Sequence, residues 1–449
     1  MKVTDLFKKY DVPAPRYTSY PTVPYWSDNP TTQDWLDSVS SGLKSAESSW
    51  SLYLHIPFCE TLCTFCGCNT SITKNHKLEN PYSQRLLQEI DLYLKNCPEL
   101  LKRPLKSLHL GGGTPTFLSA ANLKSLLQPL LSKVRRGSEF EASVEVDPRR
   151  TSQEQLETLA SLGFNRVSLG VQDFDSEVQR LINRVQPFAM TKTITDQSRA
   201  LGFASINFDL IYGLPKQTLD SITDMAQKTI ELRPDRIALY SFALVPWIKP
   251  AQRLFKDDDV PQGQAKRELY ERARDLLLNA GYQEIGMDHF ALESDSLSKA
   301  HQSGKLHRNF MGYTDQKTEV MIGLGVSAIG ESPTCFHQNE KILTRYEERI
   351  DALKLPTLRG HKLSKDDQTY RQQILELMCT GKVSLLDQDQ VNDIKTYLAP
   401  MLADQLLILQ ENQLQVLPEG KPFLRNACMA FDKRLREKSP HTRIFSQAL

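Results

Sequence analysis

The sequence lacks several features that mark common classes of protein. No apolar run approaches the roughly 18 residues of a membrane-spanning helix, and the first nine residues hold charges where a secretory signal has an apolar core. Neither sign of charge is in excess, because 55 lysines and arginines stand against 54 aspartates and glutamates. A dedicated nucleic-acid-binding protein normally shows a basic excess. We therefore expect a cytoplasmic protein that binds neither membranes nor nucleic acids.

Cysteine is also scarce, with eight in 449 residues, and it is unevenly distributed. Disulfides are not expected in a chain of this length without a signal segment. Four cysteines are scattered singly, as small buried hydrophobic residues usually are: Cys97, Cys335, Cys379 and Cys428. The other four fall within ten residues: Cys59, Cys63, Cys66 and Cys68. This cluster needs a separate explanation.

From residue 49, short β-rich segments alternate with segments of helical apolar spacing. The β-rich segments are Leu52–Ile56, Ser107–Leu110, Ala142–Val146, Arg166–Val171, Ser205–Ile211 and Arg236–Phe242. Strand–helix units in series predict a parallel sheet covered by helices. Six units fall short of the eight that close a full barrel, so we expect a partial (β/α)6 barrel. A doubly wound sheet fits the same alternation, and both folds place functional residues at the carboxyl ends of the strands.

The remaining segments suggest four regions. We expect an N-terminal arm or lid at 1–48, the barrel at 49–255, an extension that covers the substrate at 256–362, and a small, mainly helical domain at 363–449. In the last region, Leu406–Leu409 and Leu414–Leu417 predict a hairpin. A winged helix remains open there, but the absence of a base-reading stripe favours a packing or lid role.

The clustered cysteines have the spacing Cys59-x3-Cys63-x2-Cys66, directly after the first predicted strand. Structural zinc usually takes two separated ligand pairs, and the loop offers only His55 or Cys68 as a fourth ligand. Iron–sulfur clusters are held by cysteine thiolates, usually four. Three thiolates leave one iron open, which suits the binding of a substrate or cofactor. An aromatic plane, Phe65, directly precedes the third cysteine.

This cysteine pattern resembles the signature of the radical S-adenosylmethionine (SAM) enzymes. Further blocks narrow the resemblance to the oxygen-independent coproporphyrinogen III oxidases of the haem pathway, over essentially the whole chain. The blocks are Pro15–Pro21, Tyr53–Cys59, Gly67–Asn69, Gly111–Thr116, Glu145–Arg149, Gly170–Phe174, Asp209–Pro215, Gly286–Phe290 and Arg308–Tyr313. Their number and order are much more specific than the cysteine loop alone.

The resemblance implies an oxidoreductase that converts two propionates of coproporphyrinogen III to vinyl groups without oxygen, giving protoporphyrinogen IX. It implies a [4Fe–4S] cluster on Cys59, Cys63 and Cys66, with SAM as the source of a 5′-deoxyadenosyl radical that removes hydrogen from the substrate. It also implies two SAM molecules in the site, a monomeric enzyme, and a reductant and an electron acceptor that we do not identify.

By resemblance, two groups of residues bind the two SAM molecules. Tyr53, Gly112, Glu145 and Ile329 match contacts of the SAM at the cluster, and we rank Tyr53 and Glu145 as catalytic. The second SAM is matched by Phe65, Gly113, Thr114, Gln172, Arg184, Asp209 and Ala243. Chemically, Arg184 suits a carboxylate, and its surroundings predict an amphipathic helix. Cys68 receives no role.

The substrate of the family carries four carboxylates, so the cavity should be locally basic although the chain is neutral. Arg16 in the arm and Arg308 in the late loop are candidate carboxylate partners. One alternative is a haem chaperone of a related family, which shares the three-cysteine loop. Gly67-Cys68 and the arm Pro15–Pro21 favour the oxidase, because the chaperone relatives usually lack both.

Overall fold

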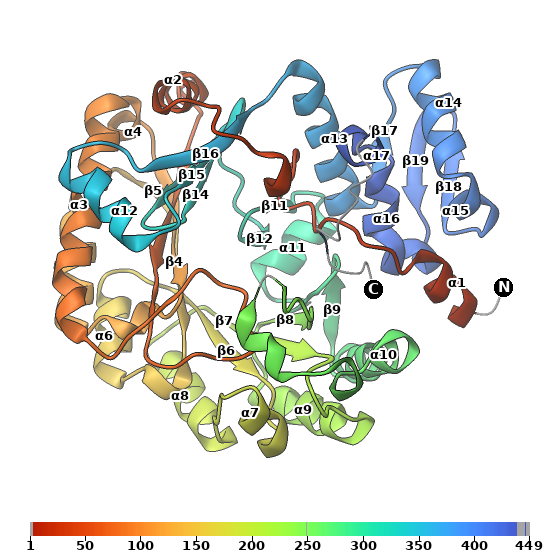
Figure 1. The fold of residues 1–449 in the computed structure, drawn as a ribbon, viewed down its shortest axis with the longest axis horizontal. Helices are drawn as coiled ribbons and strands as arrows, with labels where there is room; N and C mark the ends of the chain where they lie inside the picture. Colours follow the sequence, from red (N-terminus) through yellow and green to blue (C-terminus); the bar gives the residue numbers. More distant parts are fainter. Residues whose placement is uncertain (1–2, 248, 438–444, 446–449) are drawn as a thin grey trace.

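The computed structural model of the chain describes residues 3–247, 249–437 and 445. Its centre is a curved sheet with helices on the outer side (Figure 1). Six parallel strands form the middle of the sheet and match the six predicted segments: β1 Trp50–Ile56, β4 Leu105–Gly112, β5 Arg136–Val146, β6 Arg166–Gln172, β7 Ser205–Tyr212 and β8 Arg236–Ser241. The expected partial (β/α)6 barrel is confirmed.

The sheet is larger than the six predicted strands, with twelve in the order β16-β15-β14-β13-β1-β4-β5-β6-β7-β8-β10-β9. The additional strands come from the region after the barrel: β9 Tyr282–Ile285, β10 His289–Leu292, β13 Val320–Leu324, β14 Ile329–Glu331, β15 Cys335–Asn339 and β16 Thr357–Lys362. Among these added strands, β13 lies next to β1 and pairs with it in parallel. Residues of the expected extension are therefore continuous with the barrel sheet.

The helices between the strands form the outer arc in Figure 1. They are α3 Glu79–Asn96, α4 Glu99–Lys102, α5 Ala120–Ser132, α6 Gln153–Ser161, α7 Ser176–Leu181, α8 Phe188–Ala200, α9 Leu219–Leu232, α10 Gly263–Asn279 and α12 Leu343–Asp351. Their apolar faces pack on the strands in one large core that includes Trp50, Leu86 and Phe208. Helix α6 ends before Gly163, whose φ of +92° favours glycine at that position.

The N-terminal and C-terminal regions pack against each other. The N-terminal region holds α1 Val3–Tyr10 and α2 Thr32–Gly42, and the C-terminal region holds α13 Lys365–Thr380, β17 Lys382–Ser384, α14 Gln388–Tyr397, α15 Ala399–Ala403, β18 Leu407–Gln410, β19 Gln413–Val416, α16 Leu424–Met429 and α17 Lys433–Glu437. The predicted hairpin is confirmed as β18–β19. A second apolar cluster joins Tyr10, Tyr17 and Tyr20 of the arm to the C-terminal helices. The domain boundaries themselves stay predictions.

Short elements complete the chain: β2 Phe58–Cys59, β3 Ser71–Ile72, α11 Ser296–Gln302, β11 His307–Asn309 and β12 Gly312–Thr314. In the described residues, no helix is both long and apolar enough to cross a membrane.

Candidate functional site

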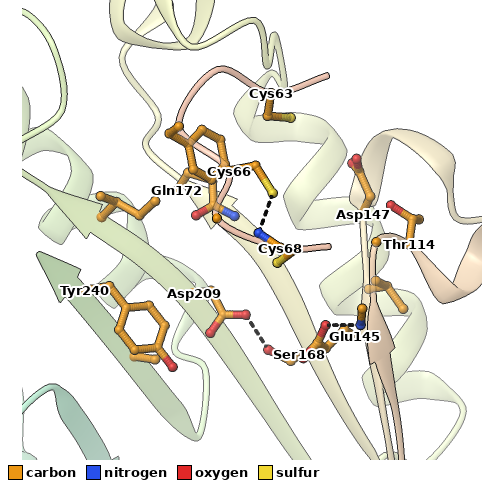
Figure 2. Close-up of a pocket in the computed structure, with 18 of the residues that line it drawn as sticks. Cys63, Cys66, Cys68, Thr114, Glu145, Asp147, Ser168, Gln172, Asp209 and Tyr240 are labelled. Carbon is orange, nitrogen blue, oxygen red and sulfur yellow. Dashed lines mark hydrogen bonds between the residues drawn. The ribbon is translucent and has the colours of Figure 1, made fainter. Parts of the chain in front are cut away.

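A cavity of about 730 Å³ opens at the carboxyl ends of the barrel strands. Most of the predicted site residues line it: Cys59, Cys63, Phe65, Cys66, Gly112, Gly113, Thr114, Glu145, Gln172, Arg184, Asp209 and Ala243. Cys68 lines it as well. Figure 2 shows the cysteine loop above one side of this space, with Glu145, Ser168 and Asp209 below it. The fold thus brings together side chains that are far apart in the sequence.

The interior of the barrel is polar, with a repeat of two residues along each strand. On β5, the polar residues that line the cavity are Glu141, Ser143 and Glu145, and Asp147 follows directly after the strand; Val146 also lines it. Alternate residues of a strand face the same side of the sheet, which explains the pattern. The neighbouring strands follow it with Ser107 and His109, Ser168 and Gly170, Asn207 and Asp209, and Ala238 and Tyr240.

The three cysteines of the motif lie in the segment between β1 and α3, with Cys59 at the end of β2 and Cys63 and Cys66 in the loop that follows. Cys63 is buried, whereas Cys59 and Cys66 are partly exposed. The loop rests on the segment after α7, because the amide of Thr64 donates to the Ile182 carbonyl at 3.1 Å. The four scattered cysteines are buried, as expected.

The donor set fits a [4Fe–4S] cluster. The sulfur of Cys63 accepts from Nη2 of Arg149 at 3.5 Å and from Nη1 of Arg184 at 3.7 Å, and the sulfur of Cys66 accepts from the amide of Cys68 at 3.4 Å. Such donors stabilise negative charge on thiolate ligands, and they are among the factors that set cluster potentials. In the part of the chain that the structure describes, no three Cys, His, Asp or Glu side chains are grouped to hold a single metal ion. A cubane does not need that grouping, since each cysteine binds a different iron.

Asp147 and Arg149 were not predicted as site residues, yet they form a charged group with Arg184 beside Cys63. Arg184 donates to Asp147 at 3.1 Å, and Arg149 donates to the same carboxylate at 2.7 Å. Burial raises the pKa of Asp147, but the charge of Arg184 and the hydrogen bond from Arg149 outweigh it, so the pKa lies below its ordinary value. The position of Asp147 at a strand end was the available sequence signal.

Arg184 differs from its sequence-based description. The sequence predicts an amphipathic helix at this position, but α7 ends at Leu181 and Arg184 lies in the loop that follows. Its side chain is buried, Nη2 donates to the Gly170 carbonyl at 2.6 Å, and Nε has no partner among the described residues. A buried donor without a partner is costly, and Arg184 also lines the cavity, so its guanidinium is a candidate to bind a ligand there.

Glu145 is held by its neighbours on β4. Nε2 of His109 donates to it at 3.2 Å and the amide of Gly112 at 3.2 Å, while the hydroxyl of Ser143 lies 2.7 Å from Nδ1 of His109. Enclosure raises the pKa of Glu145, but the hydrogen bond and charge of His109 outweigh it, and the pKa lies below its ordinary value. Glu145 is therefore an anionic acceptor that faces the cavity.

The pKa of Asp209 is shifted in the opposite direction from that of Glu145. Burial and the charge of Glu145 raise its pKa to about 6, although Ser168 and Asn207 donate to it at 2.8 and 3.0 Å. On the adjacent strand, Gln172 has a φ of +68°, a left-handed conformation that a non-glycine residue seldom adopts. Strained backbone of this kind concentrates at functional sites.

The glycines at the end of β4, Gly112 and Gly113, are required by packing. A Cβ at Gly113 would lie 2.6 Å from the Pro57 carbonyl oxygen, and one at Gly112 would lie 2.9 Å from the His55 ring. Gly112 also has a φ of +119°. These glycines let β4 approach the segment that leads into Cys59.

Tyr53 and Ile329 are not among the residues that line the cavity. The hydroxyl of Tyr53 lies 3.0 Å from Nδ1 of His55, whose Nε2 donates to the Asn69 carbonyl at 2.9 Å. The Tyr53 ring stacks on His109. Ile329 lies on β14 and packs near Trp26. Their assignment to SAM stays a prediction.

Comparison with known proteins agrees with this geometry. Residues 53–229 match the model of the radical SAM superfamily. The chain is 40% identical to the oxygen-independent coproporphyrinogen III oxidase of Escherichia coli, over 97% of this chain and 96% of the relative. It is 38% identical to the enzyme of the same name from Pseudomonas aeruginosa, over 96% and 95%.

Structural comparison extends the agreement to the fold. The solved structure of coproporphyrinogen III oxidase from Escherichia coli, reported as a radical SAM enzyme, superposes with a TM-score of 0.89 at 40% identity. The match covers 94% of this chain and 98% of the solved chain. This chain therefore belongs to the oxygen-independent coproporphyrinogen III oxidases of the radical SAM superfamily.

Proposed function

We propose that the protein converts two propionate side chains of coproporphyrinogen III to vinyl groups, giving protoporphyrinogen IX without oxygen. The observation that carries the proposal is the single cavity in which the three motif thiols, the anionic Glu145 and the buried Arg184 meet. That arrangement can hold a cluster, a sulfonium cofactor and an organic substrate together. Each propionate loses CO₂, one hydrogen atom and one electron, and the electron passes to an external acceptor.

Cys59, Cys63 and Cys66 would hold the [4Fe–4S] cluster. When bound, the cluster supplies the electron that cleaves SAM into methionine and the 5′-deoxyadenosyl radical that takes hydrogen from the propionate. Arg149 and Arg184 donate to the sulfur of Cys63 and offset negative charge at that ligand.

The other residues bind and orient SAM in this proposal. Glu145, already an anion, accepts from the ammonium or ribose hydroxyls of the cofactor, and the guanidinium of Arg184 donates to a carboxylate. Gln172 and Asp209 face the same cavity from the next two strands. We propose two SAM molecules, with Tyr53, Gly112, Glu145 and Ile329 at the first and Phe65, Gly113, Thr114, Gln172, Arg184, Asp209 and Ala243 at the second.

The test is anaerobic reconstitution with iron and sulfide, followed by SAM, a reductant, an electron acceptor and coproporphyrinogen III. We expect 5′-deoxyadenosine, CO₂ and protoporphyrinogen IX from the wild type. Cys63→Ser should lose both the cluster absorbance and the products, whereas Cys97→Ser, a buried cysteine outside the cavity, should keep both. Tight haem binding without a vinyl product would contradict the proposal and favour a haem chaperone.

A further inference from the structure

The N-terminal arm is fastened to the rest of the molecule by two arginines that bind its backbone. Arg425 donates from Nε to the Pro15 carbonyl at 3.0 Å, and from Nη2 to the Ala14 carbonyl. Arg308 donates from Nη2 to the Arg16 carbonyl at 3.2 Å. Three consecutive carbonyls of the arm are thus held by the late loop and by α16. In Figure 1 the arm, in dark red, passes from α1 beside α16 towards α2.

These contacts change the role that the sequence suggested for Arg308. Its side chain is only 3% exposed, and its guanidinium lies 4.5 Å from the centre of the Tyr313 ring. An arginine that is enclosed in this way and bonded to a backbone carbonyl positions the arm. Arg308 and Arg425 are therefore positioning residues, and the group that they deliver is the side chain of Arg16.

Arg16 is placed differently from the two arginines that hold its backbone. Its side chain is 34% exposed, and its guanidinium lies 5.6 Å from the centre of the Tyr240 ring, which lines the cavity. Figure 2 shows Tyr240 facing the same space as Asp209. Within the described part of the chain, the one hydrogen bond of the Arg16 side chain is from Nη2 to Asp288. Nε and Nη1 remain free to form a paired contact with a second carboxylate.

Two further cations, Lys266 and Arg425, lie close enough to Arg16 to interact with its charge. Lys266 on α10 donates to the Phe242 carbonyl at 2.8 Å, at the end of the barrel. Burial and the nearby charges of Arg16 and Arg425 together lower the pKa of Lys266 to about 8, and Asp11 opposes this shift. With Arg16, these cations number three against the carboxylates of Asp288 and Asp11, which favours an anionic ligand.

We propose that Arg16 binds a propionate carboxylate of the tetrapyrrole substrate, and that Asp288 holds the guanidinium ready for it. The inference rests on the proposed function, because that function supplies a substrate with four carboxylates. Arg16 then determines specificity by recognising a carboxylate that does not react, while the chemistry takes place near the cysteine loop. In this proposal the N-terminal arm covers the cavity and also supplies the side chain that binds the carboxylate.

The experiment compares steady-state kinetics of the reconstituted wild type with Arg16→Gln, Arg16→Lys, Asp288→Asn and Lys9→Gln. Neither Arg16 nor Lys9 lines the cavity, but Arg16 lies against the ring of Tyr240, which does. Lys9 is the matched control, because its ion pair with Asp404 at 2.6 Å also fastens the N-terminal region. We expect Arg16→Gln to raise KM for coproporphyrinogen III at least tenfold with kcat within threefold. Arg16→Lys should fall between wild type and Arg16→Gln. Asp288→Asn should raise KM by about threefold to fivefold, because the guanidinium loses its anchor but keeps its charge. Lys9→Gln should change KM by less than threefold.

Unchanged KM in Arg16→Gln would overturn the inference. An equal rise in KM for Asp288→Asn or Lys9→Gln would also overturn it, because the ion pair would then only hold the arm. Cluster absorbance and SAM affinity should match wild type in every variant, which a general loss of structure would not allow.

A binding measurement separates this inference from the proposed function. Coproporphyrin III has four carboxylates and protoporphyrin IX has two, and both are stable in air. Both ligands carry the two propionates that do not react, so Arg16→Gln should weaken the binding of each at least fivefold relative to wild type. An unchanged affinity of Arg16→Gln for protoporphyrin IX would refute the role of Arg16. If wild type forms no vinyl product, the proposed function fails, whereas these affinities still test Arg16.

Discussion

Arg184 donates from Nη1 to Oδ2 of Asp147 at 3.1 Å, although the two residues are 37 positions apart. The contact joins the end of β5 to the loop after α7, beside the buried Cys63. Arg149 binds the same carboxylate, so Asp147 balances two guanidiniums next to the cysteine loop. This pairing orients the guanidinium of Arg184, which lines the cavity.

Arg184→Lys should weaken SAM binding at least tenfold, because lysine keeps the charge but cannot bind Asp147, Gly170 and a ligand with one planar fork. Equilibrium dialysis of the reconstituted protein with labelled SAM would measure the affinity. Arg180→Lys, an exposed arginine on the neighbouring helix, should leave it unchanged. Equal SAM affinities in both variants would contradict the assigned role.

Asp209 should make stability depend on pH. Its folded-state pKa of about 6 lies above the ordinary 3.8, so the folded state binds the proton more tightly, and stability falls as pH rises from about 4 to about 6. Asp209→Asn cannot titrate. Its free energy of unfolding relative to wild type should therefore rise across this range, by roughly 3 kcal/mol at most.

Denaturant unfolding at several pH values, without SAM, would measure the effect of Asp209→Asn. A difference between variant and wild type that is independent of pH would show that Asp209 does not titrate in this range.

Gly113→Ala should impair assembly of the cluster site. The added Cβ would meet the backbone of Pro57 at 2.6 Å, and backbone yields only if the segment leading to Cys59 shifts. Iron and acid-labile sulfide per chain should fall at least twofold after reconstitution. Gly137→Ala is the control, since its Cβ meets nothing closer than 3.6 Å. Normal iron content in Gly113→Ala would show that the segment can move at little cost.

Glu89→Ala should destabilise the fold strongly. The buried carboxylate accepts from the amide of Gly325 at 2.8 Å, from Asn339 at 2.7 Å and from the hydroxyl of Tyr346 at 2.7 Å. Removing it leaves three buried donors unpaired, at a cost of about 3 kcal/mol or more. Chemical denaturation would measure the loss. Glu157→Ala, at an exposed position on α6, should cost less than about 0.5 kcal/mol.

The six central strands and the cysteine loop were predictable because their signals are local. Alternating strand and helix patterns require only neighbouring residues, and the spacing of Cys59, Cys63 and Cys66 lies within one loop. The alternation of the polar residues Ser143 and Glu145 can also be read from the sequence. The sequence does not show that this polar face lines an interior cavity, because a polar residue at every second position normally marks a face exposed to water.

The strands added after residue 281 were not predictable in the same way. Strand β13 is short and fully buried, and it pairs with β1 about 270 residues earlier in the chain. Nothing in its composition specifies that partner. Likewise, the packing of the Tyr17 side chain of the arm beside Asp432 depends on how the chain ends meet.

The sequence by itself determined the class of fold, the iron–sulfur motif and the family resemblance, since these are carried by residues close together in the chain. Only the tertiary structure decided that Asp147 lies between Arg149 and Arg184, and that Arg16 meets Asp288 across 272 positions. The physical reason is that such pairs depend on which strands and loops become neighbours. That choice results from the packing of the whole core and not from any local pattern.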